Sequence, residues 1–264
     1  MTEATGSTTA APPDRPLAGR RVLVTGAAGG IGAAAVSTFL AAGARVVGLF
    51  HSTPPPAELE ARCDWLACDA RSRDSVDKAF EQAASTLGGL DVLLNAAGTW
   101  RPGTPETLSD DELDMILDVN LRSTVLTNQA AFERMRHSGG QIINLGSGEG
   151  VRGNPLAPHY AVAKAGVHAW TRSVASAWGR YGITVNALAP AVRTTGADRL
   201  WEHLGEERAA AFKQSLQTAM PLRGELGDPE ADLGPVMVFL ASPGARFMTG
   251  QLIAVNGGLQ MLGA

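Results

Sequence analysis

Along this chain, short apolar runs alternate with longer segments in which apolar residues recur every three or four positions. The alternation starts near Arg20 and continues to the C-terminal region. Such a pattern is typical of βαβ units, in which a helix links two parallel strands. It predicts an α/β fold built on a doubly wound parallel sheet. The seven predicted strands are RVLVT (21–25), RVVGLF (45–50), DWLA (64–67), DVLLNA (91–96), QIINLG (141–146), ITVNAL (183–188) and QLIAVN (251–256).

A helix start and two irregular segments refine this picture. Ser109 and Glu112 have the spacing of a capping box, which predicts the start of a helix. Residues 1–16 are rich in Thr, Ala and Pro, so we expect a disordered N-terminal tail. Residues 191–226 carry charged helical sequence that interrupts the alternation. We therefore expect one domain over 17–264, with an insertion at 191–226 that covers the substrate.

Composition narrows the class of protein. The chain has 264 residues, of which 45% are hydrophobic, and this suits one large domain. A net charge of -4 gives no basic stripe for a phosphate backbone, so no nucleic acid partner is expected. The sequence has neither an apolar run of about 18 residues nor the pattern of a signal peptide, which predicts a cytoplasmic protein without membrane contact. Cys63 and Cys68 suggest neither a disulfide framework nor a metal site.

The stretch TGAAGGIG (25–32) places four glycines between a predicted strand and an Ala-rich helix. At the carboxyl end of a parallel strand, such a turn points free helix N–H groups at a bound anion, and glycine lets a pyrophosphate approach the backbone. The spacing of Gly26, Gly30 and Gly32 differs from the commoner G-x-G-x-x-G fingerprint. A flexible turn that needs positive φ would also use glycine, so this stretch alone leaves both interpretations open.

Two further features point to proton chemistry. The sequence YAVAK places Tyr160 and Lys164 one helical turn apart on the same face. Ser147 follows the apolar run IINLG, at the carboxyl end of a predicted strand, where α/β sites gather. A tyrosine is a poor base near neutral pH unless a cation stabilises its phenolate, and Lys164 is spaced to be that cation. Pairs with this spacing are also common on helix surfaces, so the pair alone decides nothing.

Taken together, these stretches resemble the short-chain dehydrogenase/reductase family, over about Arg20 to Gly258. The motifs that carry the resemblance are TGAAGGIG (25–32), NAAG (95–98), the VN of DVNL (119–120), Ser147 and YAVAK (160–164). The resemblance implies a single-domain, Rossmann-like sheet of seven parallel strands in the order 3-2-1-4-5-6-7. It also implies hydride transfer between a nicotinamide dinucleotide and a carbonyl or alcohol carbon, and a homotetramer assembled through helices near 109–137 and 157–181.

The same resemblance implies four catalytic residues. Tyr160 would donate the proton to the forming alkoxide during reduction, or remove it during oxidation. Ser147 would hold and polarise the same substrate oxygen. Lys164 would lower the pKa of Tyr160 and bind the nicotinamide ribose. Asn120 would hold a water that connects Lys164 to solvent.

The same family resemblance implies which residues contact the dinucleotide. Asn95 and Gly98 would line the adenine-ribose side, and Asp69 would face the adenine amino group. Pro190 and Thr195 would flank the nicotinamide carboxamide. The full set of predicted dinucleotide contacts is Gly26, Gly29, Gly30, Ile31, Gly32, Phe50, His51, Ser52, Asp69, Ala70, Asn95, Ala96, Gly98, Tyr160, Lys164, Pro190 and Thr195.

The end of the second predicted strand bears on the choice between NADP(H) and NAD(H). Members that use NAD carry an acidic residue there for the ribose 2′-OH, whereas this chain has Phe50, followed by His51, Ser52 and Thr53. These neutral donors favour a 2′-phosphate, and therefore NADP(H). The glycine turn lacks the Arg or Lys that many NADP-using relatives place near Gly29, so the preference over NAD(H) is slight.

The substrate is left open by the sequence. A ketoreductase acting on a 3-oxoacyl group or another medium-sized ketone is one interpretation. The ending GGLQMLGA and the short span from Phe50 to Asp69 resemble members that oxidise cyclic dihydrodiols or secondary alcohols with NAD. A catalytically inactive, dinucleotide-binding regulatory protein is the alternative from another class. The four intact catalytic positions argue against it.

Several residues near the motifs allow two interpretations. Glu149 and Arg152 follow Ser147 and are consistent with recognition of a polar substrate or with a surface ion pair. His159 precedes Tyr160 and is consistent with a substrate contact or, more simply, with a structural role. Aromatic residues that fit either a pocket wall or ordinary packing are Trp100, Trp201 and Phe212.

Overall fold

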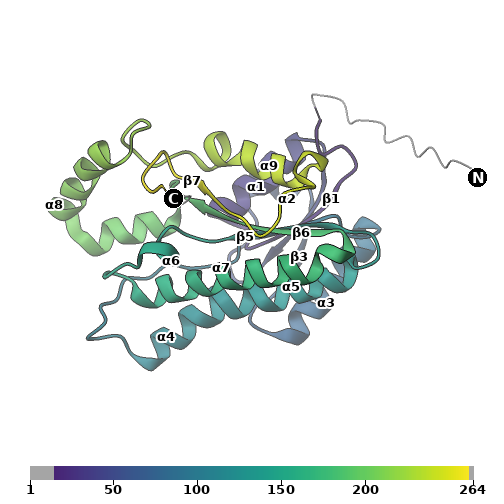
Figure 1. Ribbon diagram of the computed structural model, residues 1–264, viewed down its shortest axis with the longest axis horizontal. Helices are drawn as coiled ribbons and strands as arrows, with labels where there is room; N and C mark the ends of the chain where they lie inside the picture. Colours follow the sequence, from purple (N-terminus) through teal and green to yellow (C-terminus); the bar gives the residue numbers. More distant parts are fainter. Residues whose placement is uncertain (1–14, 262–264) are drawn as a thin grey trace, which may run out of the picture.

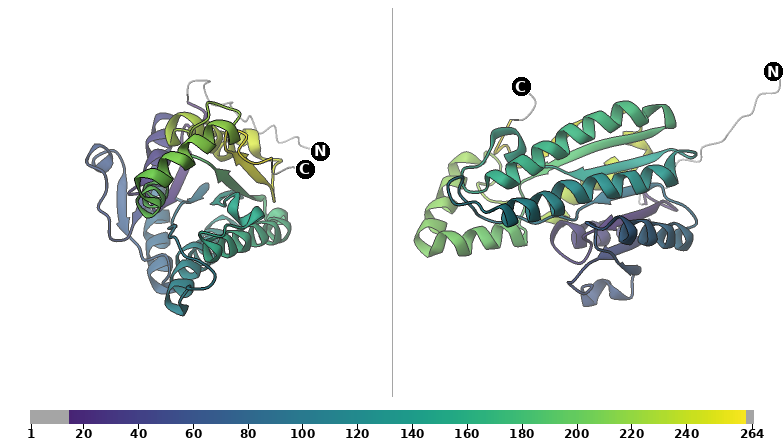
Figure 2. Two further views of the ribbon diagram at one scale, coloured as in Figure 1. Left: turned by 90° about the vertical axis from the view of Figure 1, so that its left-hand side faces the viewer. Right: turned by 90° about the horizontal axis from the view of Figure 1, so that it is seen from below.

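The computed structural model describes residues 15–261, apart from the side chain of Thr195. Seven parallel strands form one sheet in the order β3-β2-β1-β4-β5-β6-β7, which confirms the predicted fold and strand order. Helices cover both faces of this sheet (Figures 1 and 2). The strands are β1 (Arg21–Thr25), β2 (Arg45–Phe50), β3 (Asp64–Ala67), β4 (Val92–Asn95), β5 (Gly140–Leu145), β6 (Ile183–Pro190) and β7 (Leu252–Val255).

The helices follow the strands in the predicted alternation. The α-helices are α1 (Gly30–Ala41), α2 (Ala57–Glu60), α3 (Arg73–Leu87), α4 (Asp110–Leu117), α5 (Ser123–Met135), α6 (Glu149–Arg152), α7 (Pro158–Trp178), α8 (Thr195–Ala219) and α9 (Gly234–Ala241). Short π-helical turns are η1 (Asp118–Arg122) and η3 (Pro229–Leu233), and short 3-10 turns are η2 (Gly179–Tyr181) and η4 (Pro243–Ala245). Among the described helices, none combines the length and apolar character that a membrane span requires.

The predicted strand boundaries are close to those of the structure. The first three strands match residue for residue, and the remaining strands differ at their ends by one or two residues. Of the predicted tail, residues 1–14 lie outside the described part of the chain. The described chain is held to the domain from Leu17 onward, because Leu17 is buried and its N–H donates to the Ala42 carbonyl at 3.0 Å.

Two hydrophobic layers sandwich the sheet. Successive strand residues point to opposite faces, so Val22 and Val24 pack on one side of β1 and Leu23 on the other. The first face packs against α1 and α9, with Phe39 fully buried among them. The second face packs against α3, α5 and α7, with Phe80 at its centre. Because both faces are covered, the strands are rich in buried apolar residues, as expected for a parallel sheet.

Local sequence signals explain how the long helices begin and continue. Ser109 Oγ accepts a hydrogen bond from the Glu112 N–H at 3.3 Å, and the Glu112 carboxylate accepts from the Ser109 N–H at 3.0 Å, which confirms the predicted capping box. The π-turn η1 joins α4 to α5 and places Asn120 on its inner side, fully buried. The helix predicted near 109–137 is therefore two α-helices joined by a wider turn, a feature that often marks functional positions.

The carboxyl ends of the strands all lie at one end of the sheet. The strand order reverses at β1, which pairs with β2 on one side and β4 on the other. A crevice opens at such a switch point in doubly wound sheets, and it is the usual place for a ligand. The long helix α8 extends away from the sheet beside β7 (Figure 1). It changes direction at Gly205, where φ is +73°.

Candidate active site

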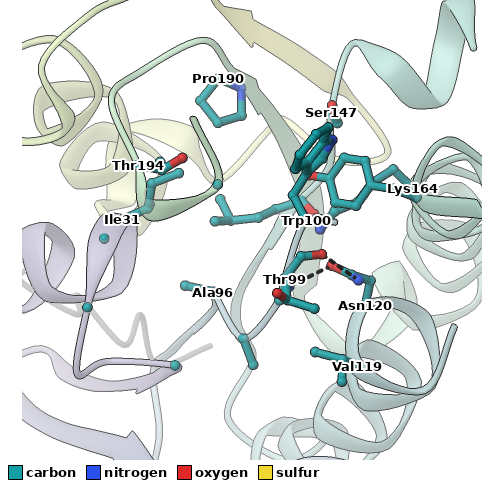
Figure 3. A pocket seen from close by; sticks show the side chains of 18 of the residues that line it. Ile31, Ala96, Thr99, Trp100, Val119, Asn120, Ser147, Lys164, Pro190 and Thr194 are labelled. Carbon is teal, nitrogen blue, oxygen red and sulfur yellow. Dashed lines mark hydrogen bonds between the residues drawn. The ribbon is translucent and has the colours of Figure 1, made fainter. Parts of the chain in front are cut away.

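A cavity of about 670 Å³ runs across the carboxyl ends of the strands, and the glycine turn and the YAVAK segment both line it. In Figure 3, Ser147, Trp100 and Lys164 gather on one side of the cavity, and Ile31, Pro190 and Thr194 lie across from them. All four predicted catalytic residues line the cavity: Asn120, Ser147, Tyr160 and Lys164. The predicted dinucleotide contacts that line it are Gly26, Gly29, Gly30, Ile31, Phe50, His51, Ser52, Asp69, Ala70, Ala96, Gly98, Tyr160, Lys164 and Pro190.

The glycine turn has the geometry of an anion cradle. Gly26 has a φ of +62°, and a Cβ on it would lie 2.8 Å from the Ala97 backbone, so another residue would push β1 away from the loop after β4. Gly29 is the N-cap of α1 and makes no side-chain cap, and a Cβ on it would meet no other atom within 4 Å. Gly30, with a φ of +50°, is equally open. The first N–H groups of α1 therefore face the cavity without a side-chain partner.

Two predicted dinucleotide contacts, Gly32 and Asn95, do not line the cavity, and a third, Thr195, is not described. Gly32 does not line the cavity, because it lies behind the turn, where a Cβ would clash with the Gly26 carbonyl. Asn95 is also buried beneath the cavity, where its Oδ1 accepts hydrogen bonds from Thr25 at 2.8 Å and Thr127 at 3.1 Å. The side chain of Thr195 lies outside the described part of the structure, and Thr194, one residue earlier, lines the cavity. Gly32 and Asn95 thus support the site from behind.

At the far end of the cavity, charged side chains gather after β2 and β3. Arg71 binds the Asp69 carboxylate through two hydrogen bonds of 2.9 Å each. This contact lowers the pKa of Asp69 to about 2. His51 Nε2 lies 3.9 Å from the same carboxylate. Because Arg71 and His51 both line the cavity, this end offers a guanidinium and an imidazole to a ligand as well as the carboxylate expected from the sequence.

The reaction end is held by backbone contacts. Lys164 is buried, and its Nζ donates to the Leu145 carbonyl at the end of β5, at 2.8 Å. Lys164 Nζ also lies 5.5 Å from the centre of the Tyr160 ring. The Ser147 Oγ accepts a hydrogen bond from the Glu149 N–H at 3.1 Å. The strand end and the helix α7 thus bring Ser147, Tyr160 and Lys164 to one wall of the cavity.

Burial shifts the pKa values of Tyr160 and Lys164. It raises the pKa of Tyr160, and the Glu149 carboxylate raises it further, while a hydrogen bond with the Ser147 hydroxyl lowers it. Burial also lowers the pKa of Lys164 to about 8, although Glu149 acts in the opposite direction. In this structure the pKa of Tyr160 is raised, so the lowering expected from Lys164 does not appear in it. Desolvation of the phenolate is the largest cause of the raised pKa.

Asn120 connects the cavity wall to two other segments. Its Nδ2 donates to the carbonyls of Thr99 at 2.9 Å and Ile116 at 3.0 Å, and its Oδ1 accepts from the Thr99 N–H at 3.2 Å (Figure 3). A Cβ on Gly98 would lie 2.9 Å from the Asn120 Oδ1, so glycine is needed for this close approach. Asn120 thus fixes the loop after β4 against the π-turn.

His168 is a site residue that the sequence reasoning missed. It is buried, and its Nε2 accepts a hydrogen bond from the Ser147 N–H at 3.2 Å. Burial lowers the pKa of His168 to about 4, and Lys164 and Arg172 lower it as well. A Cβ on Gly146 or Gly150 would lie 2.6 Å and 2.8 Å from the imidazole, so these two glycines make room for it. The sequence did contain a signal for it, because His168 lies one helical turn after Lys164 and therefore on the same face of the helix.

Glu149 turns into the cavity. Its Oε2 accepts a hydrogen bond from Asn154 Nδ2 at 2.9 Å, so the interpretation as a simple surface pair with Arg152 does not describe its position. Burial raises the pKa of Glu149, while hydrogen bonds from Asn154 and Trp100 lower it. His159, by contrast, is buried away from the cavity against the loop at Gly103, in agreement with a structural role.

Helix α8 and the loop after β4 complete the substrate side of the cavity. The Arg199 guanidinium donates to Thr99 Oγ1 at 2.8 Å, which joins the helix to that loop. The apolar side chains that line this part of the cavity are Trp100, Leu200, Trp201, Phe212 and Leu216. Within residues 15–261, no group of three or more His, Cys, Asp or Glu is arranged to hold a metal ion.

Some site residues gave weak sequence signals. Arg71 lies two residues after Asp69, at the carboxyl end of a strand, so its position was available from the strand pattern alone. Arg199 and Leu200 lie in the insertion, where no motif fixes which helix face meets the cavity. Their contribution depends on how α8 folds back over the sheet, which the local pattern does not specify.

Comparison with known proteins agrees with this geometry. A family model described as enoyl-(acyl carrier protein) reductase matches residues 26–260. The short-chain reductase protein NovJ of Streptomyces niveus is 35% identical over an alignment of 245 residues that covers 89% of this chain and 92% of NovJ. The 3-oxoacyl-(acyl-carrier-protein) reductase FabG of Vibrio harveyi is 33% identical over an alignment of 251 residues that covers 93% of this chain and 99% of FabG.

A solved structure is similar over nearly the same length. It is described as a short-chain alcohol dehydrogenase from Sinorhizobium meliloti 1021, with a TM-score of 0.86 and 34% sequence identity. The match covers 94% of this chain and 98% of that one. The chain therefore belongs to the short-chain dehydrogenase/reductase family and is an NAD(P)-dependent oxidoreductase that acts on a CH–OH or C=O group.

Proposed function

We propose that this protein is a ketoreductase that reduces a 3-oxoacyl group or another medium-sized ketone and favours NADPH over NADH. The observation that carries the proposal is the position of Ser147, Tyr160 and Lys164 on one wall of a cavity that continues to the glycine turn. The names of two relatives, a short-chain reductase and a 3-oxoacyl-(acyl-carrier-protein) reductase, agree with the reductive direction.

The residues of the turn fit a dinucleotide. Gly29 and Gly30 leave open space where a Cβ would stand, and the N-terminus of α1 presents N–H groups to it. These groups would bind the pyrophosphate. Asp69 would face the adenine, Ala96 and Gly98 would line the adenine-ribose side, and Pro190 would flank the carboxamide. When bound, the dinucleotide supplies the hydride, and the protein supplies placement and charge.

The side chains at the reaction end would polarise the ketone and donate the proton to its oxygen. Ser147 would donate a hydrogen bond to the ketone oxygen and polarise it. The Tyr160 hydroxyl would donate its proton to that oxygen as the alkoxide forms. Lys164 would bind the nicotinamide ribose and assist proton transfer to Tyr160. Asn120 would hold a water on the path from Lys164 to solvent.

The preference for NADPH rests on the far end of the cavity. No acidic residue stands directly after β2, where a carboxylate would repel a 2′-phosphate, and His51, Ser52 and Thr53 line the cavity there. Arg71 adds a guanidinium, the side chain best suited to bind a phosphate. The pairing of Arg71 with Asp69 limits this preference, because part of its hydrogen-bonding capacity is already used.

The insertion at 191–226 would cover the substrate. Trp201 and Phe212 from α8 pack together with ring centres 5.5 Å apart and line the cavity. This apolar wall suits an acyl chain or an aromatic ketone. Thr194, the N-cap of α8, lies at the start of this cover and lines the cavity too.

Calorimetric titrations with NADPH and NADH in identical salt test the cofactor. Tighter binding of NADPH is expected, and equal or tighter binding of NADH would reject the preference. The reaction is tested by following loss of NADPH with 3-oxoacyl thioesters and medium-sized aryl ketones. Failure to reduce any of them, with reproducible oxidation of a cyclic dihydrodiol by NAD, would favour the dehydrogenase alternative. Cofactor binding without turnover of any substrate would favour the regulatory alternative.

Assembly as a homotetramer in the cytoplasm completes the proposal. The helices α4, α5 and α7 and the region of β7 would form the contacts. Exposed apolar side chains in these regions support it, since Val162 on α7 is 58% exposed and Phe247, before β7, is fully exposed. Sedimentation equilibrium at micromolar concentration tests it, and a monomer would reject it.

A further inference from the structure

Glu149 is an acidic group beside the catalytic serine. Its backbone N–H contacts the Ser147 hydroxyl at 3.1 Å, and its side chain lines the same cavity. Among the described residues that line the cavity, the acidic ones are Asp69 and Glu149. Asp69 is bound by Arg71 at the adenine end. Glu149 is therefore the acidic group available on the substrate side.

The carboxylate retains hydrogen-bonding capacity. A carboxylate offers about four acceptor positions. Asn154 occupies one of them at 2.9 Å. A partly buried carboxylate with free acceptor positions is costly unless further donors reach it. Water or a substrate donor can fill these positions from the cavity.

The side chains on the substrate side of the cavity indicate the chemical character of the rest of the ligand. On the substrate side, the same cavity is lined by the aromatic side chains of Trp100 and, from α8, Trp201 and Phe212. An apolar wall with one convergent acidic group is suited to a ligand with an apolar body and one donor. The Glu149 N–H contacts the Ser147 hydroxyl, and the Glu149 charge acts on Tyr160, so we place the donor within a few bonds of the reacting carbonyl.

We propose that Glu149 binds a hydrogen-bond donor of the substrate, a hydroxyl or an ammonium group carried close to the ketone on an otherwise apolar frame. This assignment rests on the proposed ketoreductase function and specifies its substrate class. The carboxylate orients the ketone toward Ser147 and Tyr160, and it discriminates against analogues in which an acceptor replaces the donor. A site built around a polar contact rejects such analogues strongly, because its polar group is left unpaired.

Two matched ketones test the assignment. The hydroxy ketone PhCOCH2OH has a donor beside the carbonyl, and its methyl ether PhCOCH2OCH3 has an acceptor of similar size. With saturating NADPH, wild type is expected to reduce the hydroxy ketone with a kcat/KM about tenfold or more above that of the ether, the range for a hydrogen bond to a charged group. A ratio near one would overturn the assignment.

The Glu149→Gln variant separates recognition from a structural role. Its amide can accept from the hydroxyl or donate to the ether, so the ratio is expected to fall toward one. If Glu149 only ties α6 to Asn154, both ketones lose activity equally and the ratio stays high, which rejects the assignment. Arg152→Gln, on the same short helix, is the matched control and should leave the ratio unchanged. Circular dichroism and NADPH titration check that each variant is folded.

The outcomes also distinguish this assignment from the function on which it rests. Reduction of both ketones with no preference rejects the role of Glu149 and leaves the ketoreductase function intact. Absence of NADPH-dependent reduction of both ketones and of the 3-oxoacyl thioesters rejects the proposed function and the assignment together.

Discussion

The two ends of the cavity are built differently. At the reaction end, Asn120, Lys164 and His168 are at most 4% exposed, and each makes a hydrogen bond with a backbone group. At the adenine end, the side chains of His51 and Arg71 are 58% and 42% exposed, and they contact another side chain, that of Asp69. Buried groups fixed by backbone cannot be replaced by solvent, whereas exposed charges are screened. We therefore expect large effects from the first group and modest ones from the second.

The largest effect is expected for Tyr160→Phe. Removing the hydroxyl takes away the proton donor, and general acid catalysis contributes about 10²- to 10⁴-fold, so kcat should fall about a thousandfold. The phenyl ring keeps the packing, so NADPH affinity by calorimetry should change little. Steady-state kinetics on the same ketone with NADPH measure the loss. A variant that keeps more than a tenth of the wild-type kcat would show that another group supplies the proton.

The sequence predicted that the residues of the reaction end lie together, and this placement has a physical reason. Tyr160 and Lys164 lie on one helix and Ser147 ends a strand, so period and topology alone bring them together. The family resemblance placed Gly32 and Asn95 among the cofactor contacts, whereas the structure has Gly32 behind the turn and Asn95 buried beneath the cavity. A motif records which residues a turn needs, but it does not say which face of the turn each residue occupies.

Acid unfolding should reveal the buried, neutral state of His168. Its pKa of about 4 lies below the ordinary value in an unfolded chain, so the unfolded state binds a proton first as the pH falls. Stability from this group is present above about pH 6.5 and is lost progressively toward pH 4, by about 3 kcal/mol in total. Urea unfolding at several pH values measures this loss.

A variant separates the contribution of His168 to the pH dependence of stability from the contribution of the carboxylates. In His168→Gln the free energy of unfolding should depend less steeply on pH between about 6.5 and 4, while the amide oxygen can still accept from Ser147. His137→Gln, at an exposed position, serves as the control and should follow wild type. Identical pH slopes for His168→Gln and wild type would mean that His168 already carries a proton in the folded protein.

Catalysis should also depend on His168 through Ser147. In His168→Leu the Ser147 N–H loses its acceptor, and we expect kcat to fall about tenfold, in proportion to one buried hydrogen bond. KM should change little, because His168 does not line the cavity. Recovery of kcat in His168→Gln would identify the hydrogen bond, rather than packing, as the cause. Equal losses in the Leu and Gln variants would assign the effect to packing alone.

The smallest effect is expected for Arg71→Ala at the adenine end. The exposed guanidinium is worth about 1 kcal/mol, so NADPH affinity should fall about fivefold, with a smaller change for NADH. Arg73→Ala is the matched control, because Arg73 is equally exposed and pairs with Asp77 outside the cavity. Titrations at two salt concentrations sharpen the test, since screening should shrink the Arg71 effect. An equal loss for NADPH and NADH would mean that Arg71 positions Asp69 and the adenine instead of binding a 2′-phosphate. The choice of cofactor would then depend on His51, Ser52 and Thr53. The strand pattern placed these residues after β2 but did not fix where their hydroxyl and imidazole groups point.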